Sequence, residues 1–377
     1  MKPILFILSI AMHLVLHGQI TISDSFEHDG ITRTYSYYVP ASYTPENPVP
    51  LVIGLHGTSS SGEVFEQHRD FRPIADTANF IVVYPNGTKI VGISFWNYGN
   101  VMGSTVDDVG FIETLIDTLS AHYSIDQSRV YATGMSNGSF MSYALACQSN
   151  RFAAIGAVTG SMSTSMYSSC SPSQTTPVLH IHGTADDVNP YDGGFAMASI
   201  DDVVEFWVNE NQCNPTPIVT AIPDIDITDN ATATHYLYEN GVNGSTVEFF
   251  KVENGGHSWP GSPMPNSSEV TCMDFDACKE IWRFFSQHAH PTLGVNEQSD
   301  DFQFVVYPNP ATNELNIKLE SSKRISKVQL GNSKGEIIYD EKGEDIQNLK
   351  VYHLHSGTYF ITIYSDSGKA TKKILIL

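Results

Sequence analysis

The sequence predicts an α/β fold, with a mostly parallel sheet between layers of helices, followed by a small all-β domain. Between residues 20 and 288, short apolar and β-branched runs alternate with longer amphipathic segments. Continuous apolar runs are typical of parallel strands that are buried on both faces, and the helices between them cover those faces. The 377 residues allow more than one domain, because domains usually contain roughly 100 to 200 residues.

In five segments, an apolar or β-branched run is followed by a loop that contains glycine or histidine. We predict a strand in each of them: 50–57, 80–87, 129–136, 177–186 and 246–256. Longer amphipathic segments lie between and after them, and these are the predicted helices: 62–78, 107–123, 137–149, 197–211 and 274–288. Sites in parallel sheets form in the loops at the carboxyl ends of the strands. We therefore expect functional side chains in the loops that follow these strands.

The amino-terminal residues have the pattern of a signal peptide. Lys2 precedes an apolar run, and Gly18 and Gln19 follow it. The run is too short for a membrane anchor and has the wrong flanking residues for one. We predict a signal peptide over 1–18 and a catalytic domain over 19–289. No later stretch is long and apolar enough to span a bilayer, so a secreted, soluble mature chain without a transmembrane segment is expected.

The character of the sequence changes after residue 289. Residues 290–302 are polar, with one proline and one glycine, which is typical of a linker. Residues 303–377 contain short alternating segments separated by turn residues, at the spacing of a small β-sandwich. No Ser, His or Asp of this region lies in a context typical of catalysis. We therefore predict a separate β-sandwich domain without chemistry of its own.

The chain is strongly acidic, with 20 Lys and Arg against 41 Asp and Glu and a formal net charge of −21. Such a surface repels phosphate backbones and anionic membranes, so no nucleic-acid partner is expected. The simpler interpretation of this negative charge is that it keeps the protein soluble in an extracellular medium.

The cysteines indicate disulfides rather than a metal. Five cysteines in an exported chain leave at least one unpaired. We expect the pairs Cys147–Cys170 and Cys272–Cys278 and a free Cys213. No two cysteines show the C-x-x-C spacing of a zinc site, so no metal is predicted.

The segment "YATGMSNGSFMSYALAC", residues 131–147, contains the G-x-S-x-G pattern at Gly134, Ser136 and Gly138. This pattern lifts a serine from the end of a strand into an exposed position at the start of a helix. Alone it is weak, and a structural turn is the alternative. Here a predicted strand precedes it and a predicted helix follows it, which favours Ser136 as a nucleophile.

A nucleophilic serine needs a base, and the base needs an orienting carboxylate. In hydrolases with a strand-turn-helix serine, these residues follow in the order Ser, acid, His. "HIHGTADDVNPY" offers Asp186 and Asp187 directly after a predicted strand, and "VENGGHSWPG" offers His257 in a glycine-flanked loop. We predict Ser136, Asp186 and His257 as the triad.

Other histidines fit a base less well. His180 and His182 alternate within a strand, where a structural role is the better interpretation. His56 precedes the serine in the chain and is expected to brace its own loop.

Further residues are predicted around the serine. An oxyanion hole needs backbone N–H groups aimed at the developing negative charge, and we predict those of Asn137 and Thr58. Trp259, two residues after His257, and Trp96, close to Tyr98, are predicted to wall the cleft and stack on a sugar or phenolic ring. Ordinary packing of large aromatic side chains is the alternative.

Six motifs agree in order with a known family: "LHGTSSSG", "FIVVYPNG", "VDDVGFIETLID", "RVYATGMSNGS", "HGTADDVNPY" and "GGHSWPG". Over roughly Ser25 to His288 the chain resembles the secreted esterases that include polyhydroxybutyrate depolymerases, feruloyl esterases and acetylxylan esterases. The resemblance implies an α/β-hydrolase fold, no cofactor and the same triad. Family members often carry proline at the position of Asp187, which favours Asp186 as the acid, with Asp187 as the fallback. The chain departs from the family after "LHG" and at Ser139, where glycine is common.

The tail carries a second resemblance. "VYPNPATNELNIKLE" and "SGTYFITIYSDSGKATKKILIL" resemble the C-terminal sorting domain of the type IX secretion system. This implies that the type IX machinery is a partner and that the protein is extracellular or attached to the cell surface. A carbohydrate-binding module is the alternative, but such modules display exposed aromatic residues.

These observations predict a secreted serine esterase that acts on polymer-linked esters. Feruloyl or acetyl esters of plant polysaccharide are the first expectation, because little sequence remains between Asp186 and His257 for a large lid, and an open site suits a polymer. An extracellular polyhydroxybutyrate-type depolymerase is the alternative. A third hypothesis is that the chain is a non-catalytic surface binding protein with the same scaffold.

Overall fold

The computed structural model describes residues 21–265, 268–290, 304–319, 324–332, 337–343, 346–365 and 368–376. The predicted signal peptide and residues 291–302 of the predicted linker lie outside these ranges. The chain divides into two compact units between His290 and Pro291. Each unit is described by itself.

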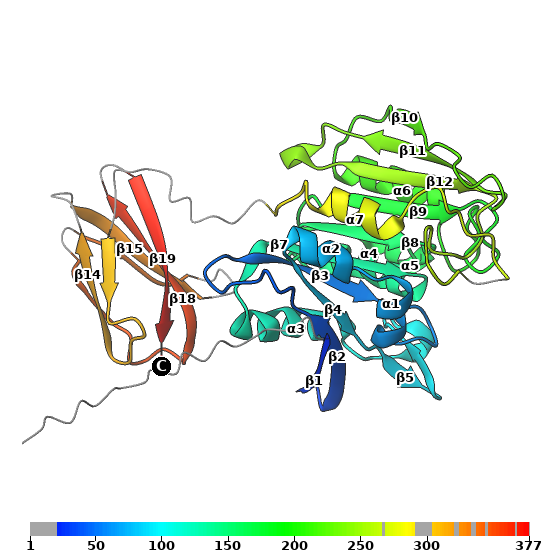
Figure 1. The fold of residues 1–377 in the computed structure, drawn as a ribbon. Coiled ribbons are helices and arrows are strands. Elements are labelled where there is room, and N and C mark those ends of the chain that lie inside the picture. The colour runs from blue at the N-terminus through cyan, green and yellow to red at the C-terminus, as the bar shows by residue number, and fades with distance from the viewer. Residues whose placement is uncertain are drawn as a thin grey trace, which may run out of the picture. The chain divides into compact units, whose positions relative to one another are not determined.

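The first unit is built on a mostly parallel sheet (Figure 1). Ten strands of the described chain form it in the order β1-β2-β4-β3-β7-β8-β9-β12-β11-β10. Neighbours from β4 to β12 run parallel, whereas β1, β2, β11 and β10 pair antiparallel at the two edges. The bounds are β1 Thr21–His28, β2 Ile31–Tyr38, β3 Val49–Leu55, β4 Ile81–Pro85, β7 Ile125–Met135, β8 Ala154–Val158, β9 Val178–Gly183, β10 Ile218–Ala221, β11 Thr232–Tyr238 and β12 Val247–Glu253.

Helices cover both faces of this sheet, as continuous apolar strands require (Figure 1). Buried side chains of α3, α4 and α6 join one core cluster, and those of α1, α2 and α7 join a second. The fold class predicted from the sequence is confirmed. The helix bounds are α1 Gly62–His68, α2 Arg72–Ala78, α3 Asp108–His122, α4 Asn137–Gln148, α5 Thr164–Ser169, α6 Ile200–Glu210 and α7 Ala277–Phe285.

Two differences between the predicted and the observed elements follow from the local sequence. The segment 62–78 forms two helices, because Pro73 lies in the first turn of α2, where proline fits, and cannot sit inside a longer helix. Strand β8, whose sequence AIGAV is short and rich in small residues, is absent from the predicted strands, yet it is buried between β7 and β9.

One of the two expected disulfides is present. Cys147 in α4 is bonded to Cys170 at the end of α5. The pairing of Cys272 with Cys278 was wrong, because both are free thiols, as is Cys213. The Cys272 Sγ donates to Asp274 Oδ2 at 3.6 Å, whereas Cys278 is buried in the core from the first turn of α7.

The second unit consists of two antiparallel sheets around its own core. Strands β13 Phe304–Tyr307, β14 Glu314–Leu319 and β17 Asn348–Lys350 form one sheet. Strands β16 Ile337–Lys342, β15 Ile325–Asn332, β18 Gly357–Ser365 and β19 Gly368–Ile376 form the other, in that order. The predicted all-β tail is confirmed. None of the described helices is long and apolar enough to cross a membrane.

Candidate active site

Ser136 lies in a sharp turn between β7 and α4. Its backbone has φ 56° and ψ −122°, a strained conformation for a residue with a side chain. The flanking glycines permit this turn. A Cβ on Gly134 would lie 2.4 Å from the carbonyl group of Gly138, and a Cβ on Gly138 would lie 2.1 Å from the Leu55 carbonyl oxygen. The strand, turn and helix are therefore packed too closely for any other residue at these two positions.

Asp186 and His257 come from the loops after two neighbouring parallel strands, β9 and β12. The His257 Nδ1 lies 2.8 Å from Asp186 Oδ2. Asp186 is buried, and its Oδ1 accepts hydrogen bonds from the backbone N–H groups of Val188 and Asn189 at 3.0 and 2.8 Å. Asp187 is exposed and makes no recorded contact with His257. The geometry therefore pairs His257 with Asp186.

Ser136 and His257 line one cavity of about 780 Å³, here called the Ser136 cavity. Asn137 and Thr58, the residues predicted for the oxyanion hole, line it as well. Asn137 is the first residue of α4, so its N–H has no acceptor within the helix. Four of the predicted residues, from three separate segments of the chain, thus meet at one cavity.

The loop after β3 is held against Ser136 by His56. The buried His56 ring accepts a hydrogen bond from the Gly87 N–H at its Nε2, at 3.0 Å, so its Nδ1 carries the proton and donates to the Gly57 carbonyl at 2.7 Å. A Cβ on Gly57 would lie 3.4 Å from the Ser136 Cβ. His56 therefore braces the loop that approaches the serine, as the sequence predicted.

The two tryptophans predicted to wall the cleft do not line the Ser136 cavity. Trp96 is fully buried, and its indole N–H donates to the His56 carbonyl at 3.0 Å, so it supports the loop from behind. Trp259 is buried against the ring of Phe65, with centroids 5.5 Å apart. The assignment of Trp96 and Trp259 to substrate binding was wrong, because both rings fill the core that supports the site.

Other apolar side chains form the walls of the Ser136 cavity. Tyr98 stacks on Phe140 with ring centroids 4.9 Å apart, and both rings face the cavity. Met102 is 70% exposed and Phe195 is fully exposed, although both are large and apolar. Exposed apolar side chains gathered at one place are typical of a binding surface.

A buried chain of hydrogen bonds ends at Asp186. His182 Nε2 lies 2.8 Å from the Asn189 carbonyl oxygen and 3.4 Å from Asp186 Oδ2. Both are acceptors, so His182 carries its proton on Nε2 and accepts at Nδ1 from His180 Nε2, at 3.3 Å. The Tyr143 hydroxyl then donates to His180 Nδ1 at 2.6 Å. The network is fully satisfied only when both histidines are neutral.

This network predicts that acid destabilises the first unit. Burial lowers the pKa of His182 to about 4, and it lowers the pKa of His180 as well. The unfolded chain takes up these protons near pH 6.5, whereas the folded chain does not. The free energy of unfolding should therefore fall as the pH drops from about 6.5 to about 4, by up to about 1.4 kcal/mol per pH unit for each histidine.

Tryptophan fluorescence during urea unfolding measures this for the first unit alone, because all four tryptophans of the chain lie there: Trp96, Trp207, Trp259 and Trp282. The matched variant is His182→Gln, whose stability should depend less steeply on pH over the same range. Equal stability of the wild type at pH 5 and pH 7 would contradict the prediction, and so would identical slopes in the two proteins.

Sequence reasoning did not find three residues that position the site. The Asn189 side chain donates to the Thr159 carbonyl at 2.7 Å and so fixes the loop after β9. The Glu269 carboxylate accepts from the His257 N–H at 2.9 Å. His182 contacts Asp186 from within β9. Only His182, four residues before the acid, left a signal in the sequence, and that signal also fits a purely structural histidine.

Two groups of possible metal ligands occur in the described part of the chain, and neither lines the Ser136 cavity. In the more buried one, of Asp229, Cys272 and Asp274, both carboxylates already accept backbone N–H hydrogen bonds. We assign no metal to either group.

Comparison with known proteins identifies esterases as similar proteins. Residues 33–210 match the family model described as esterase PHB depolymerase, so the resemblance indicated by the sequence motifs is confirmed. The chain is 26% identical over 269 residues to the bifunctional acetylxylan esterase/xylanase of Neocallimastix patriciarum, covering 71% of this chain and 35% of that protein. It is 30% identical over 193 residues to a probable feruloyl esterase C of Aspergillus niger, covering 49% of this chain and 64% of that protein. The chain thus spans between about one third and two thirds of these relatives.

An acetyl xylan esterase from Aspergillus awamori is among the similar solved structures, with a TM-score of 0.48 and 14% identity over 67% of this chain and 94% of that one. Residues 305–377 match the model of a secretion system C-terminal sorting domain. The second unit is therefore a sorting domain, and the protein is a secreted or cell-surface protein.

Proposed function

We propose that the chain is a secreted serine carboxylic-ester hydrolase with Ser136, His257 and Asp186 as its triad. One observation carries the proposal: the strained serine turn and the hydrogen-bonded Asp186–His257 pair open onto the same cavity. The strands that precede these three residues lie in one sheet. Along the chain the residues follow in the order Ser, Asp, His, which is the order in such hydrolases.

In the proposed mechanism each of these groups has a defined role. His257 Nδ1 donates to Asp186, so Nε2 is the nitrogen that takes the Ser136 proton as Oγ attacks the ester carbonyl. The N–H groups of Asn137 and Thr58 stabilise the oxyanion. His257 then gives its proton to the leaving alcohol, and the acyl group stays on Ser136. Water, deprotonated by the same Nε2, releases the acid and restores the serine.

For the substrate we propose esters carried on a polymer, first of all feruloyl or acetyl esters of plant polysaccharide. The names of the relatives support this class. The Ser136 cavity favours the bulkier acyl group, because its volume of about 780 Å³ is far larger than an acetyl group and its lining includes Tyr98 and Phe140. Esters of a solid polyester are the second candidate, which the exposed Met102 and Phe195 support.

The test is hydrolysis by the purified protein of methyl ferulate, acetylated xylan and a polyhydroxybutyrate suspension in parallel, with the Ser136→Ala variant as the blank. Release of ferulate or acetate alone would establish a carbohydrate esterase. Clearing of the polyester suspension would make the protein a depolymerase. If none of these esters, nor a simple 4-nitrophenyl ester, is hydrolysed, the esterase proposal is wrong and a non-catalytic binding protein replaces it.

We also propose that the second unit is the part recognised by the type IX secretion machinery. Each unit has its own hydrophobic core, so the first unit is expected to fold without the second. A chain that ends at His290, expressed in a bacterium with this secretion system, should stay inside the cells, whereas the full chain with Ser136→Ala should be exported normally. Export of the truncated chain would refute this role.

A further inference from the structure

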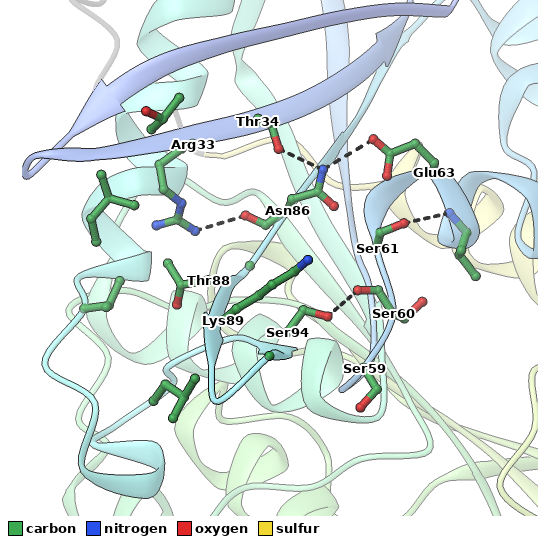
Figure 2. A pocket seen from close by; sticks show the side chains of 17 residues that line it. Arg33, Thr34, Ser59, Ser60, Ser61, Glu63, Asn86, Thr88, Lys89 and Ser94 are labelled. Atoms are coloured by element: carbon green, nitrogen blue, oxygen red, sulfur yellow. Dashed lines mark hydrogen bonds between the residues drawn. The ribbon is translucent and has the colours of Figure 1, made fainter.

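The first unit has a second cavity, of about 740 Å³, which Figure 2 shows. Its walls come from β2, from the loop that follows β3, from the start of α1 and from the two-stranded sheet of β5 Thr88–Ile90 and β6 Ile93–Phe95. Ser59 lines both cavities. We call it the Lys89 cavity, after its exposed lysine. Ser59 follows Thr58, the residue proposed for the oxyanion hole, in the chain.

The two cavities lie on opposite faces of β6. Ile93 and Phe95 line the Ser136 cavity, and Ser94 lines the Lys89 cavity. Successive side chains of a strand point to opposite faces, so the alternating sequence Ile-Ser-Phe gives one apolar wall and one polar wall. The strand therefore separates two spaces of different chemistry at the edge of one site.

The wall between the cavities is fixed by hydrogen bonds. The Ser59 N–H donates to the Ser94 carbonyl at 2.8 Å, and the Ser94 hydroxyl donates to the Ser60 carbonyl at 2.5 Å. The Asn86 side chain accepts from the Gly62 N–H at 2.8 Å and donates to the Thr34 hydroxyl at 3.1 Å. Figure 2 shows these polar side chains around the cavity. A preformed wall holds a ligand at a lower cost in conformational entropy.

The lining of the Lys89 cavity suits a hydroxylated ligand. Serine and threonine side chains, the Asn86 amide and the Glu63 carboxylate line it, together with the apolar side chains of Ile31, Val64, Ile90 and Val106. Lys89 is exposed and takes part in none of the ion pairs found in the described residues, in a chain whose net charge is −21. Its ammonium group offers three hydrogen-bond donors. The adjacent Arg33 is buried and already paired with Asp108 at 2.6 Å, so it supports the wall and leaves Lys89 as the accessible cation.

We propose that the Lys89 cavity binds the sugar chain that carries the scissile ester, while the acyl group occupies the Ser136 cavity. Lys89 donates hydrogen bonds to ring hydroxyls or to a sugar carboxylate. The inference rests on the proposed function and adds to it a site for the alcohol side of the substrate. Ser59, which lines both cavities, joins this site to the one that holds the ester.

The test compares esters that share an acyl group but differ in the alcohol. One pair is methyl ferulate and a feruloylated arabinoxylan oligosaccharide, and the second is 4-nitrophenyl acetate and an acetylated xylo-oligosaccharide. Two variants change the cavity: Lys89→Ala removes the ammonium group, and Val64→Trp fills the space from α1. Lys279→Ala, on the exposed side of α7, is the matched control.

Lys89→Ala should lower kcat/KM for the saccharide esters about tenfold, mainly through KM, the size expected for lost hydrogen bonds to a charged group. Both cavity variants should leave the two small esters within about twofold of the wild type, and Lys279→Ala should change nothing. Equal effects on small and saccharide esters, or none on either, would overturn the Lys89 site while leaving the esterase intact. A wild-type protein that hydrolyses none of the four esters would refute the proposed function and this inference with it.

Discussion

Replacement of Ser136 by alanine is expected to lower kcat by about 10⁴-fold to 10⁶-fold on any ester that the wild type hydrolyses. The variant loses the Oγ that attacks the carbonyl, and Ser59, the other serine among the described residues that line the Ser136 cavity, does not lie in a strand-to-helix turn of the G-x-S-x-G type. The fold should be unchanged, because alanine bears the same backbone strain at φ 56° as serine does. Steady-state kinetics, with a thermal unfolding curve for each protein, measure both effects.

The matched control is Ser139→Ala. Ser139 is fully buried one turn further along α4, its hydroxyl has no hydrogen-bond partner, and it does not line the cavity. Removal of the Ser139 hydroxyl should leave kcat within about twofold of the wild-type value, because the substitution lies away from the catalytic groups. Retained activity in Ser136→Ala would refute the nucleophile, and a comparable loss in Ser139→Ala would show that the turn, rather than the Ser136 hydroxyl, had been damaged.

Asp186→Asn is expected to lower kcat by about 10⁴-fold, and Asp187→Asn by less than about twofold. Asp186 Oδ2 accepts the proton on His257 Nδ1, whereas an amide that turns its NH₂ group toward the ring favours the wrong tautomer, with the proton on Nε2. His257 then cannot take the serine proton. Asp187 is exposed and has no such contact, although it is the neighbouring carboxylate.

The two variants are close to isosteric with the wild type, so the difference between their kcat values reports the role of each carboxylate. Activity should be measured at pH 7 to 8, where the buried histidines near Asp186 are neutral. Similar mild effects of both substitutions would show that another group orients His257. A larger loss in Asp187→Asn would reverse the assignment.

The sequence predicted the mostly parallel sheet, five of its strands, and four residues that line the Ser136 cavity: Thr58, Ser136, Asn137 and His257. These predictions rest on local signals: G-x-S-x-G needs only the close approach of β7 and α4, and the loops that hold Asp186 and His257 follow strands of recognisable pattern. Parallel strands bring their carboxyl ends to one edge, so local patterns were enough to place distant residues together.

The failed predictions concern contacts that depend on packing between distant segments. Trp96 and Trp259 are close in sequence to the site, but their rings turn toward the core, and nothing in their neighbours indicates that direction. Phe195 and Met102 line the cavity from loops without a pattern. Cys272 and Cys278 are near one another in the chain, yet α7 carries Cys278 into the core while the Cys272 thiol donates to Asp274.

The backbone of Ser136 links activity to resistance against heat. A residue with a side chain at this positive φ costs of order 1 to 3 kcal/mol, which the surrounding packing must offset. Glycine at the same position would relieve this cost and remove the nucleophile in a single step. Directed evolution that screens only for survival at high temperature therefore rewards loss of the serine, so any library of heat-resistant variants must be screened for hydrolysis as well.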